Sequence, residues 1–87
     1  MFISGNIISG EFDEYKNEFS IEQVKHFDIK TTIKEGQLKC LYQYLLKQEN
    51  SEEGQVITLY DQMPLKLSQE EVRYFIHDLE AIKSLYF

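Results

Sequence analysis

The C-terminal segment carries the feature that most constrains the fold. Ser68 is followed three residues later by Glu71, the spacing of a capping box that satisfies backbone N–H groups at a helix N-terminus. Beyond this box, large apolar residues recur three and four positions apart: Val72, Phe75, Ile76, Leu79, Ile82 and Tyr86. The spacing predicts an amphipathic helix over 69–85, whose apolar face must pack against another element.

The segment before residue 28 mixes strand and turn signals. Residues 2–12 are rich in β-formers, and they fit either one bent strand or a hairpin that turns at Gly5 and Asn6. For 13–18 we predict a loop or a helical turn, with a strand that begins near residue 22. The alternation of Phe19 and Ile21 with polar residues also fits a strand, so the sequence leaves helix and strand open over 11–27.

The middle of the chain favours further strands. Phe27, Ile29, Thr31 and Ile33 alternate with polar residues, which predicts a strand, and 34–37 around Gly36 is predicted to be a hairpin turn. We predict a second strand over 38–47 with apolar residues on both faces, as in a covered central strand. The rest of the prediction consists of an acidic loop over 48–55, a strand over 56–61 and a short segment over 65–67 that leads into the C-terminal helix.

Together these segments predict one α+β domain over 1–87. We expect a curled antiparallel sheet of about four strands with one C-terminal amphipathic helix on one face, and a short extra helical turn near 13–19 as an option. So short a chain buries only about two-thirds of its unfolded surface. With six Tyr and six Phe, we expect some rings to face a partner. A homodimer through the uncovered sheet face or through Tyr74, Tyr86 and Phe87 is one such arrangement.

The charge is acidic overall and unevenly placed. The chain carries a formal net charge of −6, and residues 25–47 are basic while both flanking segments are acidic. An acidic balance disfavours non-specific binding to duplex DNA or to an anionic membrane. Cys40 is the single cysteine, so no intrachain disulfide forms, and we expect it to be a small buried hydrophobic residue. With no recognisable secretory signal, a cytoplasmic location is expected.

The ionisable residues show no catalytic or metal-binding pattern. His26 and Asp28 are predicted on one strand face, but no third or fourth ligand has a recognisable spacing to them. The glycines form no phosphate-binding loop, and no cofactor is implied. Paired carboxylates occur in predicted loops and in a first helical turn, where such groups are normally solvated. We therefore expect a protein that is not an enzyme.

The acidic clusters point to a partner with a basic surface. Clusters at 11–18, 49–53 and 69–71 are expected to form a negative surface together, and carboxylates can mimic the phosphates of nucleic acids. The composition is typical of an AT-rich bacterium or its bacteriophage. We hypothesise a phage or mobile-element inhibitor of a host nucleic-acid-handling or defence protein, similar in role to anti-CRISPR proteins and DNA mimics. The expected contact residues are Glu11, Asp13, Glu14, Tyr15, Glu18, Glu49, Glu52 and Glu53.

The basic segment 25–47 supports an alternative function. On the predicted hairpin, four lysines would share one sheet face: Lys30, Lys34, Lys39 and Lys47. A sheet face with cations and stacking rings is a common platform for single-stranded nucleic acid. The alternative hypothesis is therefore a single-stranded nucleic-acid-binding protein.

Overall fold

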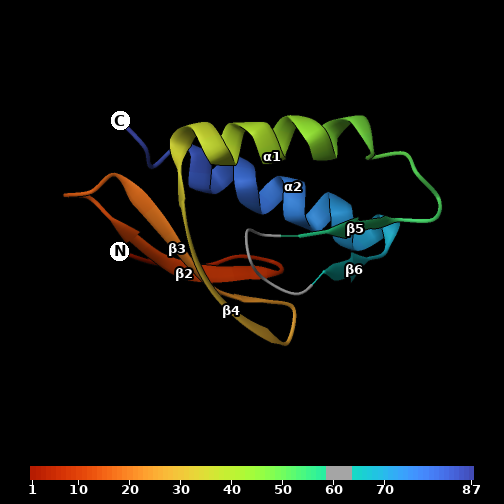
Figure 1. The fold of residues 1–87 in the computed structure, drawn as a ribbon, viewed down its shortest axis with the longest axis horizontal. Helices are drawn as coiled ribbons and strands as arrows, with labels where there is room; N and C mark the ends of the chain where they lie inside the picture. Colours follow the sequence, from red (N-terminus) through yellow and green to blue (C-terminus); the bar gives the residue numbers. More distant parts are fainter. Residues whose placement is uncertain (59–63) are drawn as a thin grey trace.

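The structure combines two antiparallel sheets with two helices (Figure 1). It is a computed structural model and describes residues 1–58 and 64–87. Four strands form the first sheet in chain order: β1 Phe2–Ser4, β2 Ile8–Asp13, β3 Glu18–Val24 and β4 Phe27–Lys34. The second sheet is a hairpin of β5 Gln55–Ile57 and β6 Leu65–Leu67, and the helices are α1 Glu35–Lys47 and α2 Gln69–Lys83. The α+β prediction is confirmed, but the sheet is not curled and there is a second helix.

Helix α2 forms as its sequence predicts. The N–H of Glu71 donates to Ser68 Oγ at 3.1 Å, and Glu71 Oε1 accepts from the N–H of Ser68 at 2.9 Å. All six residues of the apolar stripe are buried. Tyr86, which follows the helix, is 8% exposed and donates its hydroxyl to the carbonyl of Ile33 at 2.8 Å. The expectation that Tyr86 is an exposed ring was therefore wrong.

Helix α1 replaces the predicted turn at 34–37 and the predicted strand at 38–47, both of which were wrong. Its start is closed by Gln37 Oε1, which accepts from the N–H of Lys34 at 2.9 Å. Leu38 and Leu45, seven positions apart, are fully buried on one face of this helix. Cys40 lies on another face and is exposed, so the expectation that it is buried was also wrong.

The N-terminal half is a set of hairpins. Of the two alternatives for residues 2–12, the structure has the hairpin, in which Gly5 and Asn6 lie in the turn that joins β1 to β2. A turn over 14–17 joins β2 to β3, and β3 begins at Glu18, so the open segment is strand, turn and strand rather than helix. The two-residue turn of Lys25 and His26 separates β3 from β4. The strand predicted to begin near residue 22 begins at Glu18 instead and ends before this turn, where Lys25 takes a positive φ of 60°.

Strand β5 begins at the last residue of the predicted acidic loop and continues into the strand predicted for 56–61. The latter part of that predicted strand lies outside the described residues. The short lead predicted over 65–67 is a strand, β6, and it pairs antiparallel with β5. The hairpin ends one residue before Ser68, the cap of α2.

One hydrophobic cluster joins the four-stranded sheet to the helices. Its largest fully buried side chains include Phe19 of β3 and Phe75 of α2. Phe12 of β2 and Tyr86 meet edge to face, with ring centroids 5.1 Å apart. Gly10 lies opposite β3, where a Cβ atom would come within 2.1 Å of the Ser20 carbonyl oxygen. Only glycine fits there, because close strand approach leaves no room for a side chain.

A buried carboxylate ties the first hairpin to α2. Asp78 is 4% exposed, and its oxygens accept from the N–H groups of Asn6, Ile7 and Ile8 at 2.9, 2.7 and 2.9 Å. A buried charge is tolerated where several donors satisfy it. Neither helix within 1–58 and 64–87 is long and apolar enough to cross a membrane.

Candidate binding groove

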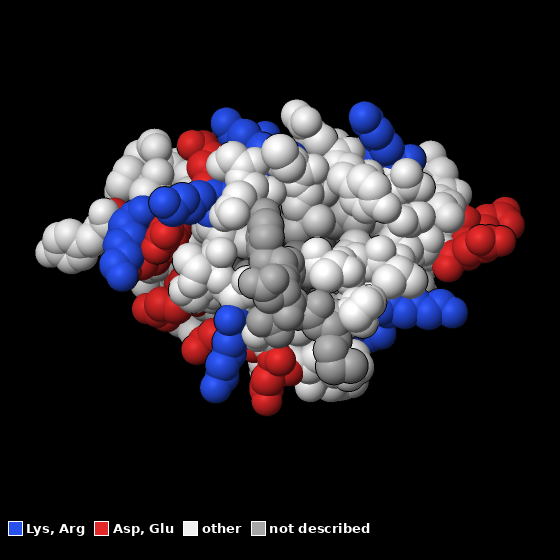
Figure 2. Space-filling view, viewed as in Figure 1, with Lys and Arg blue, Asp and Glu red and all other residues white. Residues whose placement is uncertain are grey.

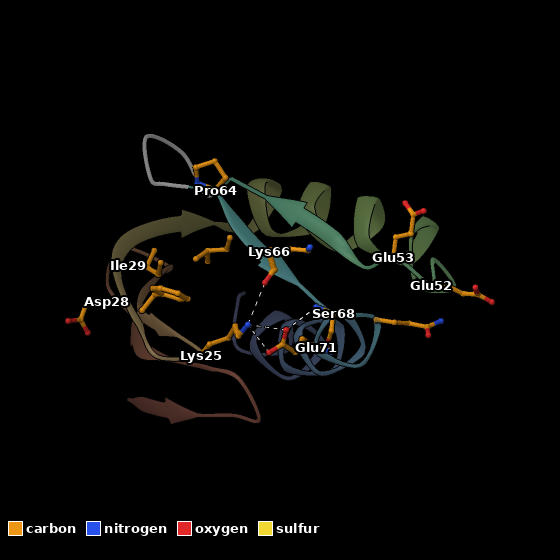
Figure 3. A pocket seen from close by; sticks show the side chains of 12 residues that line it. Lys25, Asp28, Ile29, Glu52, Glu53, Pro64, Lys66, Ser68 and Glu71 are labelled. Carbon is orange, nitrogen blue, oxygen red and sulfur yellow. Dashed lines mark hydrogen bonds and ion pairs between the residues drawn. The ribbon is translucent and has the colours of Figure 1, made fainter.

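A groove of about 730 Å³ lies between the β3–β4 turn, β6 and the start of α2 (Figure 3). Its lining residues come from segments far apart in sequence: Lys25, Phe27, Asp28 and Ile29; Glu52 and Glu53; Pro64, Leu65 and Lys66; and Ser68, Gln69 and Glu71. Its size falls within the range of about 300–1,000 Å³ that is usual for ligand sites. We therefore take it as the candidate functional site.

An ion pair crosses the middle of the groove. Lys25 Nζ lies 2.8 Å from Glu71 Oε2, and both side chains are about three-quarters buried, with 24% and 28% exposed. The same ammonium group reaches the carbonyl oxygen of Lys66 at 3.5 Å (Figure 3). The hydrogen bonds from Lys25 and from the Ser68 N–H lower the pKa of the Glu71 carboxyl. This contact links the β3–β4 turn, β6 and the cap of α2.

Apolar side chains line the side of the groove next to β4. Phe27, the first residue of β4, is a large ring that is 53% exposed. Ile29 and Leu65 are buried beside it, and Pro64 is exposed. An exposed ring at the mouth of a hollow is a common feature of binding sites.

Carboxylates mark both ends of the groove. Asp28 lies at the β4 end and accepts from Gln23 Nε2 at 2.9 Å. Glu52 and Glu53, from the loop after α1, lie at the opposite end (Figure 3). The groove lining holds four carboxylates, those of Asp28, Glu52, Glu53 and Glu71, and two ammonium groups, those of Lys25 and Lys66. Its formal charge is therefore negative.

The structure separates the acidic residues that the sequence groups together. The β2–β3 turn region and the loop after α1 lie at opposite ends of the long axis, along which the molecule extends 39 Å (Figure 1). Figure 2 likewise shows acidic side chains in separate groups at the two ends. The first group consists of Glu11, Asp13, Glu14, Tyr15 and Glu18, and the second of Glu49, Glu52 and Glu53. They do not form one continuous surface, and of these eight only Glu52 and Glu53 line the groove.

Several residues of the first group have local structural contacts. Asp13 Oδ1 accepts from the N–H groups of Tyr15 and Lys16 and thereby closes the β2–β3 turn. Glu11 binds the N-terminal ammonium at 3.1 Å, and Glu18 lies 4.0 Å from Lys34 Nζ. The Tyr15 ring projects fully into solvent.

The four lysines of the alternative hypothesis do not share a sheet face. Lys30 and Lys34 belong to β4, whereas Lys39 and Lys47 belong to α1. Lys39 also pairs with Glu35 one helical turn earlier, at 3.5 Å. The lysine-rich sheet face expected from the sequence was therefore wrong, because 38–47 is helical.

The histidine pattern is also different from the expectation. His26 lies in the β3–β4 turn rather than on a strand face with Asp28. Within the described residues, no three His, Cys, Asp or Glu side chains are grouped closely enough to hold a metal ion.

Sequence reasoning named Glu52 and Glu53 but missed Lys25, Phe27 and Lys66 as groove residues. A polar pair, Lys25 and His26, between two β-rich runs was the available signal for the turn. The Lys25–Glu71 pair joins residues 46 apart in sequence, and no local pattern reveals such a contact.

No protein-family model matches the chain, and no curated protein or solved structure is significantly similar to it. The functional proposal therefore depends on the chemistry of the groove.

Proposed function

We propose that this chain is a non-catalytic protein-binding module whose partner presents a basic surface to the groove. One observation carries the proposal: the half-exposed Phe27 ring lies beside a groove whose ends carry Asp28, Glu52 and Glu53. An aromatic anchor within a charged rim is the usual composition of a protein-binding surface.

The ion pair and the hydrogen bond made by ionisable groups in the groove favour binding over catalysis. Lys25 and Glu71 neutralise each other, and Asp28 is engaged by Gln23. Acid–base chemistry usually depends on titratable groups whose environments drive their pKa values apart. In this groove the paired groups instead fix the position of the β3–β4 turn against α2.

The charge of the whole chain supports a basic partner. A net charge of −6 attracts cationic surfaces over long range and accelerates association at low salt. Within this class we propose an inhibitor of a nucleic-acid-handling or defence protein, acting in the cytoplasm, because carboxylates can occupy sites where a partner binds phosphates. The four lysines are divided between β4 and α1, so the single basic sheet face on which the nucleic-acid alternative depended is not formed.

Affinity capture with matched charge-reversal variants tests the proposal. The chain, the groove variant Glu52→Lys/Glu53→Lys and the remote variant Glu11→Lys/Glu14→Lys would be immobilised, and proteins retained from a bacterial lysate identified by mass spectrometry. Each retained protein would then be purified and its association rate measured against salt. We expect a partner that binds the unaltered chain and the remote variant but associates with the groove variant more slowly, by about tenfold or more.

Besides a failure to capture any protein, two outcomes would contradict this function. If the groove variant retained the same proteins as the unaltered chain and bound them equally fast, the groove would not be the binding site. A purified partner whose association is independent of salt would remove the electrostatic argument.

A further inference from the structure

We propose that the groove binds an extended, basic segment of the partner protein, which pairs as an additional strand with the outer edge of β4. This inference rests on the protein-binding function proposed above and supplies its binding mode. In strand addition, main-chain hydrogen bonds provide affinity, and side-chain pockets on alternate residues provide specificity.

The edge of β4 is open among the described residues. β4 is the last strand in its sheet, and within 1–58 and 64–87 no strand pairs with its outer side. The two-residue turn makes Val24 and Phe27 the hydrogen-bonded pair that closes the hairpin. Gln23 and Asp28 are the next pair, so the N–H and C=O groups of Asp28 point away from β3. Asp28 is also one of the residues that line the groove.

The other side of the groove also presents strand backbone. The carbonyl oxygen of Lys66 accepts from Lys25 Nζ at 3.5 Å, so it points toward the β3–β4 turn. Because the N–H and C=O groups of one strand residue point the same way, the N–H of Lys66 faces outward too. An extended segment in the groove would therefore have main-chain partners on β4 and main-chain groups of β6 across from it.

The side chains around these edges define the chemistry of the segment. Phe27 offers an exposed apolar ring to the segment, and the buried side chains of Ile29 and Leu65 complete the apolar lining. Asp28 at one end, with Glu52 and Glu53 at the other, attracts lysine or arginine at the intervening positions. A second copy of this chain carries the same net charge of −6, and a nucleic acid carries phosphates, so like charge disfavours both. A basic peptide segment is the complementary occupant.

A backbone-specific variant tests strand addition. Asp28→Pro removes the outward N–H, and proline is tolerated on an edge strand where that group faces solvent. Asp28→Asn is the matched control, because it removes the charge and keeps the N–H. The probe is a capped peptide of alternating valine and lysine, titrated into each ¹⁵N-labelled protein. We expect amide shifts at Asp28, Ile29 and Lys66, and binding to Asp28→Pro that is about three- to tenfold weaker than to Asp28→Asn.

A second probe covers the case in which Asp28→Pro does not fold. The same peptide with alternate amide nitrogens methylated cannot pair as a strand, and we expect it to show no shifts with the unaltered protein. Equal binding by the two Asp28 variants, or equal binding of the methylated peptide, would overturn strand addition. A captured partner that needs Glu52 and Glu53 but is indifferent to Asp28→Pro would overturn this inference and leave the proposed function standing. The absence of any captured partner would overturn the proposed function itself.

Discussion

At the scale of single residues, the fold depends on a few polar contacts between distant segments. Asp78 joins α2 to the β1–β2 turn, and the Lys25–Glu71 pair joins α2 to the β3–β4 turn. Both contacts satisfy groups that burial would otherwise leave without a partner. Asp78 lies within the predicted helix, yet no sequence pattern indicates that its partners are the N–H groups of residues 6–8, because the contact spans 70 positions or more.

Replacement of Asp78 by alanine should strongly destabilise the protein. It leaves three N–H groups of the β1–β2 turn without an acceptor, and we expect a loss of about 3 kcal/mol or more in the free energy of unfolding. Urea denaturation monitored by circular dichroism measures the change. Arg73→Ala, on an exposed position of the same helix, is the control and should cost less than about 0.5 kcal/mol. Equal effects of the two variants would show that these N–H groups find other acceptors.

The Lys25–Glu71 pair should make stability depend on acid pH. The pKa of Glu71 is lower in the folded protein than its ordinary value of 4.5. Its contribution to stability is therefore complete above that value and is lost as the pH falls through the lower, folded pKa. We expect Glu71→Gln to destabilise the protein near neutral pH, and we expect the difference in stability between the variant and the unaltered protein to shrink as the pH falls below 4.5.

Urea denaturation across this pH range, in a double-mutant cycle with Lys25→Met, isolates the pair. The effect of Glu71→Gln should shrink when Lys25 is absent. The ion pair would contribute no stability if Glu71→Gln lowered the free energy of unfolding by the same amount at every pH. The same conclusion would follow if this loss were equal with and without Lys25→Met.

At the scale of elements, the sequence predicts best where one local signal has one interpretation. The capping box and stripe of α2 satisfy that condition. The segment 38–47 does not, because Leu38, Leu41, Tyr42 and Leu45 fit a helix, while apolar residues on both parities fit a covered strand. Because Gly36 favoured a hairpin turn, a strand was predicted for 38–47 where the structure has a helix. Two features of the sequence did indicate a helix. Gln37 accepts from the Lys34 N–H at the helix start, and Glu35 and Lys39 have the four-residue spacing of an ion pair on a helix.

Gly36→Ala distinguishes the two interpretations. In the first turn of α1, a Cβ atom at Gly36 meets nothing within 4 Å, so alanine should stabilise the protein by about 0.5–1 kcal/mol. In a hairpin turn with positive φ, the same change would destabilise it. Gly54→Ala is the contrasting variant, since Gly54 has φ of +75° and its Cβ would lie 2.0 Å from the Leu67 carbonyl oxygen. Thermal denaturation should show the two midpoints moving in opposite directions, and a lower midpoint for Gly36→Ala would contradict the helix start.

At the scale of the whole molecule, tertiary contacts determine what the sequence cannot. The sequence indicates acidic clusters, but only the fold separates them to opposite ends of the molecule and brings Glu52 and Glu53 into the lining of the same groove as Phe27 and Asp28. The groove draws on the β3–β4 turn, the loop after α1, β6 and α2. A site assembled in this way leaves no contiguous motif in the chain. The aromatic excess was a sound indication of exposed rings, although Phe27 rather than Tyr86 is the ring at the groove.

The β5–β6 hairpin should unfold together with the rest of the molecule. Strands of three residues are not stable alone, and Leu67 is fully buried in the core shared with α2 and the larger sheet. Leu67→Ala should cost about 2–5 kcal/mol, whereas Val56→Ala, at a position 56% exposed on the same hairpin, should cost much less. Far-ultraviolet circular dichroism reports the helices and tyrosine fluorescence reports packing. Coincident transitions by both probes, shifted equally by Leu67→Ala, are expected of one cooperative unit. Two separated transitions would show that the hairpin, and with it one wall of the groove, folds independently of the sheet that forms the other.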